Sequence, residues 1–118
     1  MDKAILVGII LPQNNQSDIE NHLSELSLLA ETAKVQVVGE ITQKLSKVNP
    51  AFYVGKGKAS QIVDQAKVLE VNVIIFDEEL SPAQIKNYHK LAKDIKVIDR
   101  SALILDIFKK HAKTREAK

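Results

Sequence analysis

The chain has 118 residues, of which 45% are hydrophobic and 27% charged, a balance that predicts one folded domain and excludes a disordered segment. The net charge of +2 is too small to indicate a nucleic-acid binder by itself, and the absence of cysteine excludes disulfides and thiolate metal sites. The first apolar run, residues 4–11, is too short to span a bilayer. We therefore expect a cytoplasmic protein without a membrane span.

Four short runs rich in β-branched residues predict strands, and they are nearly continuous, as in strands that are covered on both faces. They occupy residues 4–11, 35–41, 71–76 and 95–98. Segments with helical spacing separate or follow them, the first beginning near Ser17 or Asp18 and the third after Ser81-Pro82. The alternation predicts a small doubly wound, Rossmann-like α/β domain with a four-stranded parallel sheet of order 2-1-3-4 and helices on both faces.

Two segments carry uneven charge. Residues 42–60 contain four lysines and no carboxylate, and they include the one long loop, residues 43–57, which such a length predicts to be functional or mobile. The end of the chain, residues 109–118, has five basic residues against Glu116 alone. We expect the compact domain to cover residues 1–108 and the last helix to run beyond it.

The stretch NPAFYVGKGKASQIV, residues 49–63, resembles a phosphate loop only in part. A Walker loop needs G-x-x-x-x-G-K-[ST], and counting back from Gly57 places Phe52 and Ala59 where a glycine and a hydroxyl belong. A dinucleotide fingerprint would require glycine where Ser60 stands. The stretch is therefore not a hydrolytic phosphate loop.

Two interpretations of this stretch remain open. Lysines beside a helix start can bind an anion, while Phe52 and Tyr53 could stack on a base. Alternatively, the glycines make a turn, the aromatic residues fill the core and the lysines are solvated. The candidate nucleotide- or RNA-binding residues are Lys44, Lys47, Phe52, Tyr53, Gly55, Lys56, Gly57, Lys58, Arg100, Lys109, Lys110, Lys113 and Arg115.

Acidic residues follow the third predicted strand, where α/β proteins place ligands. Asp77 and Glu79 are weak candidates for holding a divalent cation, and the alternative is that carboxylates here favour the positive end of the helix after Ser81. Asp99-Arg100 ends the fourth strand and predicts an ion pair, a helix cap or a ligand contact. The histidines lie on separate helices, so we expect neither a histidine metal site nor a catalytic triad.

Three stretches together resemble the N-terminal domain of the HflX family of ribosome-associated GTPases: FYVGKGK from Phe52, FDEELSPAQIKNYHK from Phe76, and VIDRSALILDIFKKHAKTREAK from Val97. The likeness runs over the whole chain. It implies that residues 109–118 begin a linker to a helical hairpin and a G domain absent from this sequence, that GTP and Mg²⁺ belong to the full-length parent, and that no cofactor is held here. It also implies binding to the large ribosomal subunit and splitting of stalled ribosomes in the cytoplasm.

The leading expectation is accordingly a non-catalytic domain that contacts the large ribosomal subunit or its RNA. The first alternative is an accessory ATP- or GTP-binding domain. The second is a structural platform that positions the hairpin and the G domain, which are the other partners the resemblance implies.

Overall fold

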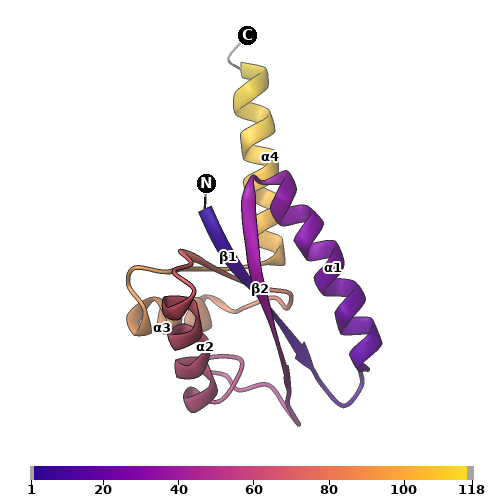
Figure 1. Cartoon of the computed structure of the whole chain (residues 1–118), viewed down its shortest axis with the longest axis vertical. Helices are drawn as coiled ribbons and strands as arrows, with labels where there is room; N and C mark the ends of the chain where they lie inside the picture. Colours follow the sequence, from indigo (N-terminus) through magenta and orange to yellow (C-terminus); the bar gives the residue numbers. More distant parts are fainter. Residues whose placement is uncertain (1, 117–118) are drawn as a thin grey trace.

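The structure, a computed structural model, describes residues 2–116, with side chains described for residues 2–109. Strands and helices alternate in the order β1 (Asp2–Ile10), α1 (Gln16–Thr32), β2 (Val35–Lys44), α2 (Lys56–Val68), β3 (Val73–Phe76), α3 (Pro82–Leu91), β4 (Lys96–Asp99) and α4 (Arg100–Glu116). The strands pair in parallel in the order β2-β1-β3-β4, which confirms the predicted fold (Figure 1). Within residues 2–116, no helix is both long and apolar enough to cross a bilayer.

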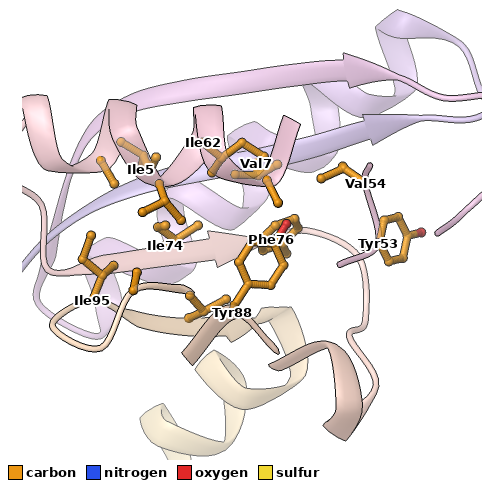
Figure 2. Packing of buried hydrophobic residues seen from close by; sticks show 14 of the residues in the cluster. Ile5, Val7, Tyr53, Val54, Ile62, Ile74, Phe76, Tyr88 and Ile95 are labelled. Atoms are coloured by element: carbon orange, nitrogen blue, oxygen red, sulfur yellow. The ribbon is translucent and has the colours of Figure 1, made fainter. Parts of the chain in front are cut away.

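Two apolar layers hold the sheet between pairs of helices. Successive side chains of a strand point to opposite faces, so Ile5 and Val7 pack under α2 and α3, whereas Ala4 and Leu6 pack under α1 and α4. Figure 2 shows the first layer, in which strand residues such as Val7 converge with Ile62 of α2. Helices on both faces are thus confirmed.

The second strand departs from the expectation of burial on both faces. In β2 buried or half-buried residues alternate with exposed ones, because this strand lies at an edge of the sheet. Ala4 pairs with Val37 but Ile5 pairs with Gly39, so Val38 is an extra residue on β2. The bulge exchanges the strand's two faces: Val37 packs on the α1 side and Ile41 on the α2 side.

The central strand has a glycine where α1 crosses it. A Cβ added to Gly8 would lie 2.8 Å from Ile19 Cγ2 and 3.0 Å from Leu23 Cδ1. Such distances are shorter than carbon atoms tolerate. The lack of a side chain at Gly8 therefore allows α1 to pack directly on β1.

The helix starts agree in part with the predicted ones. Helix α3 begins after Ser81 with a complete capping box, in which Ser81 Oγ accepts from the Gln84 N–H and the Gln84 side chain accepts from the Ser81 N–H, with Pro82 at the first helical position. Helix α1 begins earlier than expected. Its cap is Asn15, whose side chain accepts from the Asp18 N–H at 2.9 Å, so Ser17 and Asp18 lie inside the first turn.

Helix α4 passes the expected boundary at residue 108 without a break and reaches Glu116. Its last turns project beyond the rest of the molecule (Figure 1). Leu103 is buried on the sheet, whereas Leu105 and Phe108 are 59% and 65% exposed. The division into residues 1–108 and 109–118 stays a prediction.

Candidate functional site

A network of charged side chains closes the sheet where β3 and β4 end. Asp77 follows β3 and is 8% exposed. Arg100, the first residue of α4, reaches one of its oxygens twice, with Nη2 at 2.6 Å and Nε at 3.0 Å from Asp77 Oδ1. From α1, His22 Nδ1 lies 3.3 Å from Asp77 Oδ2, while Arg100 Nη1 lies 3.7 Å from Glu25 Oε2. These residues, together with Glu78, line a shallow pocket of about 310 Å³.

Asp99 completes this edge through backbone contacts. Its Oδ1 accepts from the Ala102 N–H and its Oδ2 from the Leu80 N–H, both at 2.9 Å. The structure therefore contains both the ion pair and the helix cap that Asp99-Arg100 predict. Arg100 also donates to the backbone oxygen of His22 at 2.8 Å, so its Nε and Nη2 groups both have partners within the domain.

Glu78 links the network to the loop that precedes α2. The Tyr53 hydroxyl donates a hydrogen bond to the Glu78 carboxylate. Burial, followed by the neighbouring Asp77 charge, raises the pKa of Glu78. Burial and the Glu78 charge likewise raise the pKa of Tyr53 to about 12. Both groups therefore lose their protons less readily than they would in water.

Side chains of α3 hold the loop between β2 and α2 through hydrogen bonds to its backbone, and the expectation that this loop is functional or mobile stays a prediction. Gln84 Nε2 donates to the backbone oxygen of Asn49 at 3.0 Å, and Asn87 Nδ2 donates to that of Ala51 at 2.9 Å. The ring of Phe52 meets that of Tyr88 edge to face, with centroids 5.2 Å apart. These contacts therefore attach the loop to α3 at Asn49, Ala51 and Phe52.

The aromatic pair of this loop packs inward. Tyr53 is 7% exposed and lies in the α2–α3 core layer, against which Phe52 packs while partly buried. Figure 2 places Tyr53 at the margin of that layer, beside Val54. This arrangement favours core packing over base stacking for both rings.

The turn does not require the two glycines, and their expected role in binding an anion stays a prediction. Gly55 caps α2 with φ −63°, a value open to any residue, and Cβ atoms added to Gly55 or Gly57 would meet nothing within 4 Å. The left-handed residue of the turn is Tyr53, with φ 69°. The segment thus makes a turn, as one of the two interpretations expected, but the turn does not depend on Gly55 or Gly57.

The lysines stay on the surface. Lys44 ends β2, Lys47 lies in the loop and Lys56 opens α2, all exposed, while Lys58 is half-buried. The loop lies at the end of the molecule where β1 and β2 terminate, whereas α4 projects from the opposite end (Figure 1). Of the expected basic contacts in α4, Lys109 is exposed, and the side chains of Lys110, Lys113 and Arg115 lie outside the described residues.

The acidic residues carry no evident metal site. Among residues 2–109, no three or more histidine, aspartate or glutamate side chains converge as metal ligands. Both oxygens of Asp77 already face Arg100 or His22, and Glu79 is exposed.

Sequence reasoning missed His22, which it treated as isolated. The order 2-1-3-4 places the end of β3 beside the start of α1, and this was the available signal that His22 would meet Asp77.

Fold and edge geometry together define the class: a small Rossmann-like α/β domain with a charged network at the carboxyl ends of its strands. Solved structures share this fold. One is a complex of SsGBP with GDP (TM-score 0.68, 25% identity, 94% of this chain and 30% of that chain). Another is a GTP-binding protein from Sulfolobus solfataricus in complex with GDP (TM-score 0.64, 26% identity, 92% of this chain and 30% of that chain).

Sequence comparison is more specific. The family described as GTP-binding GTPase N-terminal matches residues 20–109. The chain is 44% identical over 118 residues to GTPase HflX of Alkalihalophilus pseudofirmus, covering all of this chain and 27% of that protein. It is 39% identical over 117 residues to GTPase HflX of Escherichia coli K12, covering 99% of this chain and 26% of that protein. The chain belongs to the HflX GTPase family, as its N-terminal domain, and spans about a quarter of the length of these curated relatives.

Proposed function

We propose that this domain contacts RNA of the large ribosomal subunit, as part of a GTPase that helps dissociate or rescue stalled ribosomes. The proposed contact residues are Lys44, Lys47, Lys56 and Lys58, at the end of the molecule where the strands terminate. The domain itself is a recognition element in this proposal, and it performs no chemistry.

One observation carries the proposal: a lysine-rich surface segment without a carboxylate leads into an uncapped helix. Residues 42–60 contain no Asp or Glu. Helix α2 has Gly55 at its N-cap, no side-chain hydrogen bond to that cap and no acid in its first turn, so backbone N–H groups there remain available to an anion. Hydrogen bonds from α3 to Asn49 and Ala51 hold the backbone between these lysines, which lowers the cost of ordering this segment on binding.

Co-sedimentation of the chain with large ribosomal subunits across a salt series tests this proposal. Four lysine–phosphate contacts predict that raising salt from about 50 to 200 mM lowers affinity on the order of 100-fold. Alanine at Lys44, Lys47, Lys56 and Lys58 should remove most of the binding and flatten its salt dependence. Alanine at the exposed Lys67, Lys90, Lys93 and Lys96 serves as a control with the same loss of charge. Equal losses in both variants, or no binding at low salt, would refute the assignment.

Further parts of the proposal concern the full-length parent. Its GTP and Mg²⁺ are assigned to a G domain with a Walker motif, because this chain lacks G-x-x-x-x-G-K-[ST]. Its own helical hairpin and G domain are partners of this domain, and its location is the cytoplasm. The support is membership of the GTPase HflX family.

The uncapped start of α2 also favours a second candidate, an accessory ATP or GTP site. Lys56 and Lys58 would hold its phosphates. Calorimetric titration with each nucleotide separates the two functions: no heat at millimolar ligand removes the nucleotide site, while ribosome binding can persist. Alanine at both lysines should abolish nucleotide binding but only weaken ribosome affinity.

The exposed apolar residues Leu105 and Phe108 of α4 favour a third candidate, a platform for the hairpin and G domain. In the full-length parent, aspartate at both positions should then lower the GTPase rate while the domain keeps its fold by circular dichroism. An unchanged rate would remove this candidate.

A further inference from the structure

A groove of about 880 Å³ runs beside β4, the strand at the edge of the sheet opposite β2. Lys96, Val97 and Ile98 all line it. Successive side chains of a strand point to opposite faces, so a groove lined by all three follows the outer edge of the strand itself. Its other wall is α3, through Ile85, Lys86 and His89.

The outer edge of β4 carries unpaired backbone groups. Among the described strands, β4 pairs with β3 alone. The Lys96 N–H points inward and donates to the backbone oxygen of Asn72 at 2.9 Å. Because the direction alternates along a strand, the N–H and C=O of Val97 point outward into the groove. A further strand could pair there.

The groove combines an apolar floor with a basic rim. Its apolar lining includes Ile85 and Ile95, while Lys86 and His89 lie one turn apart on α3 and Lys93 follows the end of that helix. Lys96 adds a fourth basic group at the start of β4. The acids that line it, Asp2 and Asp94, lie on chain segments outside α3, and Asp2 Oδ1 accepts a hydrogen bond from Asn72 Nδ2.

We propose that this groove binds an extended acidic segment of a partner protein, which adds as a fifth strand on β4. Alternating apolar and acidic residues suit it, since one set covers the floor and the other meets the basic rim. A second copy of this chain would oppose two basic rims. RNA lacks the edge donors and acceptors of a strand, and the residues that line this groove include no Phe, Tyr or Trp.

The test uses the 118-residue chain and a fluorescein-labelled peptide of ten alternating glutamates and valines. Fluorescence anisotropy should show saturable binding, which the double variant Lys86→Glu/Lys93→Glu weakens about tenfold more than Lys90→Glu/Lys67→Glu. This control makes the same change in net charge at two exposed lysines that do not line the groove. Amide exchange supplies the backbone readout: the Val97 N–H should be slowed by the peptide, and a peptide N-methylated at alternate residues should lose affinity.

Several results would overturn the proposal. These are no binding at 1 mM peptide, equal losses in the two double variants, or undiminished affinity of the N-methylated peptide. Protection of Val97 that grows with chain concentration in the absence of peptide would instead assign the edge to a second copy. Displacement of the peptide by polyuridine, with protection of Val97 by the RNA, would assign it to nucleic acid.

Discussion

Replacing Gly8 by alanine should destabilise the fold through a single contact. The new Cβ would lie 2.8 Å from Ile19 Cγ2, about 1 Å closer than an ordinary carbon contact. Ile19 cannot yield easily, because its branched Cβ restricts χ1 in a helix and the residue is fully buried. The methyl groups of Leu23 are at 3.0 and 3.2 Å, but they are the far end of a more adaptable side chain.

The expected cost follows from two opposing effects. Overpacking of a core typically costs about 1–3 kcal/mol. Replacing glycine by alanine restricts the unfolded chain and returns about 0.4–1 kcal/mol. We therefore expect Gly8→Ala to lower the free energy of unfolding by roughly 1–2 kcal/mol. Gly39→Ala is the matched control: its Cβ would lie 3.5 Å from Leu69 Cδ1, an ordinary contact, so stability should stay level or rise slightly.

Urea unfolding followed by circular dichroism measures both changes, with equal m-values required for the comparison. A double-mutant cycle identifies the contact. Ile19→Leu removes the Cγ2 methyl, so Gly8→Ala should cost less in that background. If Gly8→Ala is as stable as Gly39→Ala, or if its cost is the same with leucine at position 19, the close approach of α1 to β1 does not explain this glycine.

Three further predictions concern the core and the charged edge. Among the described residues, the Tyr88 hydroxyl is the one buried side-chain polar atom without a hydrogen-bond partner. Tyr88→Phe should therefore raise the free energy of unfolding by about 1 kcal/mol in urea titrations, and a loss of stability would mean that the hydroxyl is satisfied. Because burial raises the pKa of Glu78 above its unfolded value, the folded chain holds more protons between those values and stability falls as pH rises through them. Glu78→Gln should therefore flatten thermal stability above pH 4.5 and raise it at pH 7, with the exposed Glu79→Gln as control, and equal profiles would contradict this. Arg100→Met leaves Asp77 buried with His22 alone and should cost about 2–4 kcal/mol, much of it recovered when Asp77→Asn is added; additive losses would argue against the ion pair.

The strand order and layers were predictable because β1 and β3 are covered on both faces and appear in the sequence as uninterrupted apolar runs. The bulge in β2 was not, since it depends on pairing between Ile5 and Gly39, which no local pattern specifies. The start of α1 was misplaced by two or three residues because Asn15, Ser17 and Asp18 are all capable caps.

The candidate site was predictable in part for a related reason. The helix cap and the ion pair of Asp99-Arg100 could be predicted from the position of these residues between β4 and α4. The cap is a local contact, and the ion pair is with Asp77 at the end of the neighbouring strand β3. His22 was missed because its partner is 55 positions further along the chain, and only the strand order brings the two together. Likewise, the attachment of the β2–α2 loop to α3 could not be predicted. It depends on the side chains of Gln84 and Asn87, which donate hydrogen bonds to the loop backbone.

Helix α4 starts at the charged edge with Arg100, packs on the α1 side of the sheet through Leu103 and Ile107, and leaves the molecule at the other end. A helix of 17 residues is about 25 Å long. A tilt of about 10° at its base would move its tip by roughly 4 Å. The ion pairs of Arg100 with Asp77 and Glu25, together with the packing of Leu103 and Ile107, therefore fix the direction in which the last turns of α4 project, and a small change in these contacts would be amplified along the helix.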